Sequence, residues 1–597
     1  MSLPALERRK KTSYKNFNVA IYCPVENINN IDDFEEFDRK YEAAFGNIKV
    51  GRAYLEDFRG GNTISKERLL RLKEYFEKKG IATSGGITTC APSSPDFGFA
   101  SLCYSSEEGQ KMIKEAVKMN AELFDEVIFD DFYFINCRCP KCIEEKESYG
   151  ENLNWSQFRL KQKKYVTEEL VMKTAKEINP NINVIVKFPQ WFEDFNETGY
   201  DLVTDTSLFD SIYTGTETRN PSYSQQHLPK YLSYNTMRLY GSNKPGSNLG
   251  GWFDPYECTY NLTSYVEQGY LTMFAKASEV TLFCLGSLMN DPQFKLFPDA
   301  CAQMFAEADK YLGLLGNPVG AGAYHPSYGV GEKNIHSYLG QCGIPMEMCL
   351  DYPENSKSVF LAESAACDKD IVSKMKKSLM NGSDVIVTSG FVQAMGKDFE
   401  EFANIKYTSR KAIVKDYCFS KNCGINLSGK YAGEKPILIP QLDFCTNDTW
   451  EIAAAFGNDN NFPIILSFSY GNGTVSVVTI PDDMGDLYSY PREILTSIRS
   501  LFTKECGAAI DAPSNVQLFL YDNDYFILRS DLPYETEVKI KLPTENAMIE
   551  ILNYNSAVIA DMERVSEGEA ARINGSTVTL TIGSGINYVC RFVNKDR

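Results

Sequence analysis

Histidine is nearly absent from this chain, and its scarcity limits the chemistry that the protein can perform. Only three histidines, His227, His325 and His336, occur in 597 residues. A histidine-based catalytic triad, or a metal site built from several histidines, is difficult to assemble from so few side chains. Aspartate and glutamate number 79 together, so carboxylates are the groups available for acid–base work.

Positive charge and long apolar runs are also in short supply. The 61 lysines and arginines leave a formal net charge of -18, which argues against a nucleic-acid partner because phosphate binding needs clustered cations. No apolar run approaches the length that spans a membrane, and no apolar stretch follows the basic start of the chain as it would in a secretory signal. The 17 cysteines, an odd and scattered set, fit reduced thiols better than a disulfide framework. We therefore expect a cytoplasmic protein with neither a membrane nor a nucleic-acid partner.

The first 300 residues alternate short apolar runs with amphipathic ones. Eight runs have the length and composition of buried strands: 17–24, 48–55, 81–88, 126–132, 183–189, 211–216, 250–253 and 281–285. Helical patterns such as 65–79 and 106–120 separate them. Eight such units predict a (β/α)₈ barrel, which we assign to residues 13–317. An open, doubly wound sheet is the alternative, but it usually has fewer strands in a span of this length.

The remainder of the chain predicts two further domains. Residues 318–507 again alternate strand and helix patterns, which indicates an open-sheet α/β domain of amidotransferase-like type. The strand at 384–388 runs into Ser389 and Gly390, with no cysteine nucleophile there, so we expect a structural or oligomer-forming role. Residues 508–597 contain short alternating strands and turns, which are typical of a small β-sandwich.

Carboxylates and indoles stand where the barrel strands should end. In a β/α barrel the reacting groups lie at the carboxyl ends of the strands. Glycoside hydrolysis needs one carboxylic acid to protonate the leaving oxygen and one carboxylate to attack the anomeric carbon or activate water. Asp131 is the candidate general acid/base, and Asp254 the candidate nucleophile or base, with Glu217 as the alternative second carboxylate. The candidate sugar-binding residues are Tyr54, Glu56, Asp130, Trp191, Glu217 and Trp252.

Two other functions use the same residues. A non-catalytic sugar-binding protein on a barrel scaffold would keep Trp191 and Trp252 but would not need a carboxyl group with a raised pKa. A metal-dependent hydrolase would use the acids as ligands, which the shortage of histidine makes the weaker hypothesis.

Three cysteines directly follow the fourth strand. Cys137, Cys139 and Cys142 are spaced C-x-C-x-x-C, and such thiolates can converge on one tetrahedral zinc ion. A fourth ligand must come from elsewhere; Cys103, in the loop after the third strand, is the first choice and Cys90 the second. Four thiolates leave no open position, so the zinc would be structural.

The order of barrel, open α/β domain and β-sandwich resembles the family 42 β-galactosidases of the clan A glycoside hydrolases. In that family a cysteine after strand three and a C-x-C-x-x-C after strand four bind zinc, and Cys103, Cys137, Cys139 and Cys142 match this arrangement. The resemblance implies a glycosidase for a small oligosaccharide or β-galactoside-like substrate and a homo-oligomer, with a trimer favoured. The family's two catalytic glutamates would correspond to Asp131 and Asp254, so the shorter side chains leave open whether the configuration is retained or inverted.

Overall fold

The computed structural model describes residues 14–91, 99–150, 152–421, 426–457, 459–541, 547–552, 571–574 and 577–594. The chain divides into two compact units, Met1–Gly313 and Leu314–Arg597. None of the helices in the described part has both the length and the apolar character needed to cross a bilayer.

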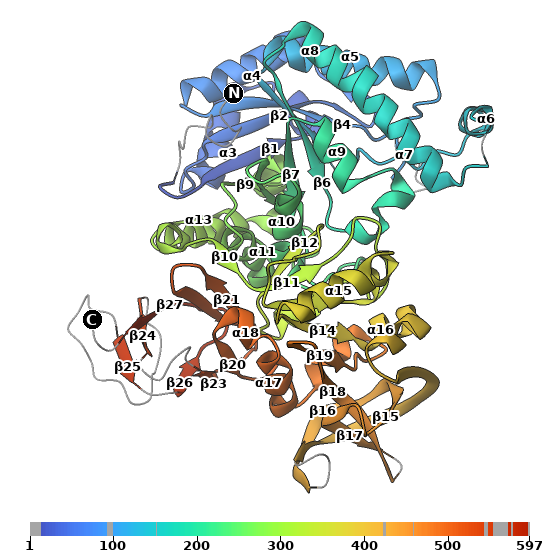
Figure 1. Ribbon diagram of the computed structural model, residues 1–597. Helices are drawn as coiled ribbons and strands as arrows, with labels where there is room; N and C mark the ends of the chain where they lie inside the picture. The colour runs from blue at the N-terminus through green and yellow to red at the C-terminus, as the bar shows by residue number, and fades with distance from the viewer. Residues whose placement is uncertain are drawn as a thin grey trace. The chain divides into compact units, whose positions relative to one another are not determined.

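The first unit is a closed barrel of eight parallel strands (Figure 1). Strand β1 pairs in parallel with β2 on one side and with β9 on the other, which closes the sheet. This closure confirms the predicted (β/α)₈ barrel and rules out the open-sheet alternative. The strands are β1 Asn18–Cys23, β2 Arg52–Arg59, β4 Ala82–Thr88, β5 Glu126–Asp130, β6 Asn183–Phe188, β7 Ser211–Gly215, β8 Asn248–Phe253 and β9 Glu279–Leu282; β3, Asn62–Thr63, is a short antiparallel addition to β2.

Helices cover the outside of the barrel, and Figure 1 shows α4 and α5 over strands β2 and β4. Serine side chains begin both helices: Ser65 accepts a hydrogen bond from the Arg68 amide, and Ser106 from the Gly109 amide. The main helices of the unit are α3 Phe34–Phe45, α4 Lys66–Lys78, α5 Glu107–Leu123, α7 Trp155–Tyr165, α8 Lys173–Ile178, α10 Leu232–Asn243, α11 Leu262–Phe274 and α13 Phe297–Ala308. Shorter helices are α2 Val25–Asn29, α6 Pro140–Ser148, α9 Leu202–Leu208 and α12 Leu285–Asn290, and a π-helical segment, Val166–Met172, joins α7 to α8.

Bulky side chains fill the barrel interior. Tyr22, Tyr54, Tyr213 and Trp252 are fully buried there together with Ile128 and Ile185 from β5 and β6. The Tyr54 hydroxyl donates to Glu279, the first residue of β9, so this side chain points to the amino ends of the strands. An interior of this kind is a packed core, which leaves the carboxyl ends of the strands as the place for a site.

The second unit contains a nine-stranded mixed sheet with the strand order β12-β11-β13-β14-β19-β18-β17-β15-β16. Five strands are parallel: β11 Ala321–Tyr324, β12 Met346–Cys349, β13 Ser358–Leu361, β14 Asp384–Thr388 and β19 Gly473–Val478. Four are antiparallel: β15 Ile405–Lys421, β16 Asn426–Phe444, β17 Trp450–Gly457 and β18 Asn460–Tyr470. Helices α14 Ile335–Gln341, α15 Ile371–Met380, α16 Ser389–Met395 and α17 Arg492–Ser500 accompany the sheet. The predicted open sheet is therefore present; β15 and the first part of β16, which lengthen its antiparallel side, were not predicted.

The last strands of the chain form the predicted β-sandwich. One sheet has the order β10-β21-β22-β27-β24-β25 and the other the order β20-β23-β26, with an apolar core between them. The strands are β10 Pro318–Val319, β20 Ala509–Asp511, β21 Val516–Tyr521, β22 Tyr525–Ser530, β23 Thr536–Lys541, β24 Ala547–Ile551, β25 Ala571–Asn574, β26 Thr577–Ile582 and β27 Asn587–Asn594. The sequence also predicts a turn at Asn574-Gly575, and Gly575 lies outside the described residues. The domain limits 13–317, 318–507 and 508–597 stay predictions.

Close packing inside the barrel wall gives a first testable prediction. A β-carbon added at Gly250 of β8 would lie 2.2 Å from the Glu279 backbone oxygen, whereas one added at Gly241 of α10 would meet nothing nearer than 4.0 Å. We expect Gly250→Ala to lower the free energy of unfolding by about 1–3 kcal/mol, and Gly241→Ala to raise it by up to about 1 kcal/mol. Urea unfolding of both variants checks this, and equal effects would contradict it.

Candidate active site

A cavity of about 650 Å³ is lined by residues at the carboxyl ends of the barrel strands and in the loops that follow them. Its size is within the usual range for a small-molecule site. The charged residues that line it are Glu26, Arg59, Asp130, Asp131, Lys187, Glu217, Arg219, Asp254 and Glu257, and the aromatic ones are Phe99, Phe132, Phe134, Trp191, Trp252, Tyr256 and Phe283.

Lys187 lies at the centre of the charged wall. Alternation along β6 places it on the same inner face as Ile185, one layer nearer the carboxyl end of the strand. Its side chain is 2% exposed, and Nζ lies 2.8 Å from Glu217 Oε1, 3.0 Å from Asp131 Oδ2 and 3.5 Å from Asp130 Oδ1. Burial alone would lower the pKa of this ammonium, but the three carboxylates outweigh burial and raise it. Lys187 is therefore a fixed positive charge.

Asp131 follows β5 and keeps some contact with solvent, since its side chain is 20% exposed. The Tyr200 hydroxyl donates to its backbone oxygen at 3.1 Å, which holds the residue at the cavity mouth. Burial raises the pKa of Asp131, Lys187 opposes this shift, and the Glu217 carboxyl group adds to it. The net rise favours the protonated form that a general acid needs.

Asp254 is held by a different cation. Arg219, from the loop after β7, donates from Nε to Oδ1 at 3.0 Å and from a terminal nitrogen to Oδ2 at 2.8 Å. The Tyr256 amide adds a bond at 3.2 Å. Burial raises the pKa of Asp254, and the Arg219 guanidinium, which acts in the opposite direction, only partly offsets that rise. The bidentate ion pair fixes the orientation of the Asp254 carboxyl group.

Asp130 and Glu56 form a buried layer with Arg59. Arg59 donates to Asp130 Oδ2 at 2.8 Å and to both oxygens of Glu56 at 3.0 Å. Glu56 also accepts bonds from the Tyr22 hydroxyl and the Val25 amide, so its oxygens are fully occupied. Glu56 does not line the cavity, and we assign it a supporting role in place of the predicted sugar contact.

The two predicted indoles occupy different parts of the cavity. Trp252 is 1% exposed and stacks on Phe283 with ring centroids 5.3 Å apart, while Lys187 Nζ lies 4.1 Å from its ring centroid. Trp191 is only partly buried, and its ring packs edge-on against Phe195 and Tyr200. Trp252 therefore belongs to the floor of the cavity and Trp191 to its side.

The structure brings together six of the eight predicted catalytic and sugar-binding residues: Asp130, Asp131, Trp191, Glu217, Trp252 and Asp254. The other two, Glu56 and Tyr54, do not line the cavity. Tyr54 fills the barrel core and points to the amino ends of the strands. Three cations that line the cavity, Arg59, Lys187 and Arg219, were not predicted from the sequence. Lys187 carried a signal, since it is a single charge near the end of the otherwise mostly apolar strand Asn183–Phe188.

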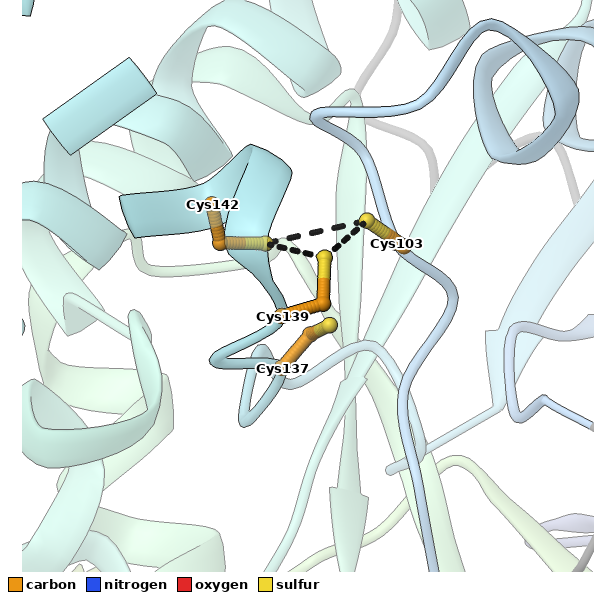
Figure 2. Close-up of side chains that lie close together, drawn as sticks. All are labelled: Cys103, Cys137, Cys139 and Cys142. Carbon is orange, nitrogen blue, oxygen red and sulfur yellow. Dashed lines mark hydrogen bonds between the residues drawn. The ribbon is translucent and has the colours of Figure 1, made fainter. Parts of the chain in front are cut away.

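The four cysteines predicted to bind zinc lie together, with their sulfur atoms turned toward one another (Figure 2). The Sγ separations are 3.5 Å for Cys103–Cys139 and 3.7 Å for both Cys103–Cys142 and Cys139–Cys142, and all four sulfurs, that of Cys137 included, lie within 4.8 Å of one another. Four sulfurs at 2.3 Å from a tetrahedral ion would be about 3.8 Å apart. The cluster can therefore hold a metal ion, and Cys90, the second choice for the fourth ligand, is not part of it.

Local structure explains how the thiols meet. Cys139 is the residue before α6, and Pro140 is the first residue of this helix, which places Cys142 in its first turn. Hydrogen bonds from the neighbouring thiols, Cys142 foremost, lower the pKa of Cys103 to about 5. A thiolate in the cluster is the form that binds a metal.

The supporting role of Glu56 gives the second prediction. Glu56→Gln leaves Arg59 with less compensation in a buried layer, so we expect the free energy of unfolding to fall by about 3 kcal/mol. Glu122→Gln serves as the matched control, because Glu122 pairs with Lys66 at 2.7 Å but both side chains are about half exposed; there we expect a change below about 1 kcal/mol. Denaturant unfolding measures both, and a Glu56 variant as stable as the control would contradict the assignment.

Comparison with known proteins agrees with this architecture. Residues 7–303 match a family described as probable glycosyl hydrolase, catalytic domain, residues 310–483 match the second domain of the uncharacterized protein SSO3021, and residues 507–582 match the probable glycosyl hydrolase C-terminal domain. The protein SSO3021 of Saccharolobus solfataricus is 23% identical over 535 residues, which cover 83% of this chain and 87% of the relative.

Solved structures show the same fold. A β-galactosidase from Bacillus circulans sp. alkalophilus is similar with a TM-score of 0.61 at 13% identity, covering 97% of this chain and 99% of that one. A cold-adapted β-galactosidase from Rahnella sp. R3 has a TM-score of 0.63 at 12% identity, covering 99% and 100%. An α-L-fucosidase isoenzyme 2 from Paenibacillus thiaminolyticus has a TM-score of 0.63 at 12% identity, covering 96% and 99%.

Proposed function

We propose that this chain, which belongs to the probable glycosyl hydrolases and is a glycosidase, cleaves a neutral glycoside or small oligosaccharide with Asp131 and Asp254. The observation that carries the proposal is the division of the cavity's acids between two cations. Asp131 shares Lys187 with Glu217, whereas Asp254 has a bidentate guanidinium partner of its own. The charge of Lys187 is thus divided among several carboxyl groups, which suits a carboxyl group that keeps its proton, whereas Arg219 orients the Asp254 carboxylate with two hydrogen bonds.

The chemistry follows from these two states. Protonated Asp131 donates its proton to the glycosidic oxygen as the bond to the anomeric carbon breaks, and ionised Asp254 either attacks that carbon or takes a proton from the attacking water. A separation of about 5 Å between the two carboxyl groups goes with retention, and a wider one with inversion. NMR detection of the anomer that is released first distinguishes retention from inversion. Glu217 remains the alternative second carboxylate.

Charge selects the class of sugar. The cavity is lined by six acidic residues and three basic ones, and each basic residue is paired with carboxylates. This acidic excess disfavours uronates and sugar phosphates by like-charge repulsion. Because two of the structural neighbours are β-galactosidases and a third is an α-L-fucosidase, aryl β-galactosides and α-L-fucosides are the first substrates to assay.

The third prediction concerns the proton donor. Asp131→Asn cannot protonate the leaving oxygen, so we expect kcat to fall by about 10²–10⁴-fold for a glycoside with a poor leaving group. A dinitrophenyl glycoside leaves without protonation and should lose far less activity. Steady-state kinetics with both substrates measures the difference, and unfolding curves check that the variant is folded.

Asp130→Asn is the matched control, because Asp130 is the neighbouring carboxylate but is bound to Arg59. If Asp130→Asn shows the dependence on leaving group and Asp131→Asn does not, the two roles are exchanged. If the parent cleaves no glycoside, a non-catalytic sugar-binding function replaces the proposal.

We also propose that the thiol cluster binds a structural zinc ion. The fourth prediction is one zinc per chain in protein purified with the metal present, measured by elemental analysis. Cys139→Ala should lose the ion and melt at a lower temperature, since structural zinc stabilises the fold that binds it. Cys90→Ala should retain it. Zinc-free parent protein, or a Cys139→Ala variant that keeps its zinc, would contradict the proposal.

The cytoplasmic location and the homo-oligomer, with a trimer favoured, belong to the proposal in the same way. The family resemblance supports the oligomer, and the reduced thiols support the location, since the described cysteines form no disulfide.

A further inference from the structure

The contacts of Lys187 go beyond those of an ordinary buried ion pair. Its ammonium touches carboxylates from two elements of the barrel: Asp130 and Asp131 at the end of β5, and Glu217 after β7. The face of Trp252 covers a further side. These groups enclose the ammonium, so the position of Lys187 Nζ determines where the three carboxyl groups lie.

The two carboxylate oxygens of Glu217 have different surroundings. Oε1 accepts a bond from Lys187, but Oε2 is buried and receives no hydrogen bond from a donor in the described residues. The carboxyl groups of Glu217 and Asp131 both contact the same ammonium, because Lys187 Nζ lies 2.8 Å from Glu217 Oε1 and 3.0 Å from Asp131 Oδ2. Two carboxylates held this close repel each other, and a proton on one of them removes that repulsion.

We infer that Lys187 is a positioning residue for the reaction, whose ammonium holds Asp131 and Glu217 together so that a single proton is kept between them. The inference rests on the proposed role of Asp131 as the proton donor and adds a role for Glu217 as its proton partner. The proton on Asp131 is then available to a leaving group, and Glu217, in this role, is not the second carboxylate of the reaction.

Other titratable and charged groups lie around Lys187, Asp131 and Glu217, and none of them is substituted in the experiment described below. They are Glu56 and Arg59 from β2, Asp130 from β5, Tyr200 before α9, Arg219 from the loop after β7, and Asp254 and Glu257 from the loop after β8. Arg59 and Arg219 bind their own carboxylates, so neither replaces Lys187 when its charge is removed.

The fifth prediction sets two substitutions against each other. Lys187→Met removes a positive charge beside Asp131 and raises the pKa of that carboxyl group, so the alkaline limb of kcat/KM should move up by on the order of one pH unit. Glu217→Gln removes a negative charge, so the same limb should move down. Lys187→Arg keeps the charge and should leave the limb near its parent position.

Lys176→Met is the matched control, because Lys176 pairs with Asp210 at 2.7 Å just before β7, at the opposite end of the barrel. It should leave the pH profile unchanged. A role in folding alone would lower activity equally at all pH values. Limbs that do not move in opposite directions for Lys187→Met and Glu217→Gln would overturn the inference.

A second measurement needs no substrate. Because the pKa of Asp131 is raised in the folded state, its contribution to stability is present at low pH and is lost as pH rises through the folded value. The difference in melting temperature between each protein and its Asp131→Asn derivative should therefore decline with pH. We expect that decline at a higher pH in the Lys187→Met background and at a lower pH in the Glu217→Gln background.

The two measurements separate two failures. If the melting-temperature difference declines at the same pH in the parent, Lys187→Met and Glu217→Gln proteins, the inference is overturned even if glycosides are cleaved. If the decline occurs at a higher pH in Lys187→Met and at a lower pH in Glu217→Gln, the inference is supported even if the parent cleaves none of the glycosides tested. In that case only the proposed function fails.

Discussion

The arrangement of the cavity depends on the cost of placing one ammonium, that of Lys187, inside the barrel. A buried cation is tolerated only when carboxylates surround it. Asp130, Asp131 and Glu217 therefore have to approach within 3.5 Å of one point, although they come from two different barrel strands and their loops. Bringing these acids together raises the proton affinity of one of them, and this is the property on which an acid catalyst depends.

A second constraint acts on the part of the cavity that contains Asp254. Arg219 has a left-handed backbone with φ of 58°, which is uncommon for a residue with a side chain. Its amide binds Gln268 and its guanidinium binds Asp254, so the conformation is fixed at both ends. Asp254 consequently has a bidentate guanidinium partner, whereas Asp131 shares the ammonium of Lys187 with Asp130 and Glu217. The two aspartates differ in their surroundings more than in their chemistry, which is how one cavity can contain an acid and a base.

Much of the barrel could be predicted because its signals are local. Apolar runs separated by helical patterns repeat eight times, and the carboxyl ends of the strands place the candidates Asp131 and Asp254 at the cavity. Strand β15 and the first part of β16 were missed because their sequence mixes charges with apolar residues and has no simple alternation. Strand β11 was missed because Ala321–Tyr324 contains only one large side chain.

The supporting residues of the site could not be predicted in the same way. Glu56 and Tyr54 stand two residues apart on the inner face of β2, but no periodicity shows that Arg59 turns back over Glu56 and covers it. Arg219 was invisible for a similar reason, since its role depends on a loop conformation. Residues at strand ends can be found from topology, whereas residues that arrive from loops depend on contacts distant in sequence.

The segment between Asp131 and Cys139 connects the two sites of the barrel unit. It begins at the proposed acid and ends in the thiol cluster, and its residues alternate: Phe132 and Phe134 line the cavity while Tyr133 and Ile135 are buried. Asn136 and Ser101 exchange two backbone–side-chain hydrogen bonds at 2.9 and 3.0 Å, which tie the segment to the loop that carries Cys103. A metal on the four thiols would fix the far end of the same segment. Loss of the metal would then loosen the cavity wall next to Asp131 before it disturbed Asp254, whose position depends on Arg219 and the loop after β8.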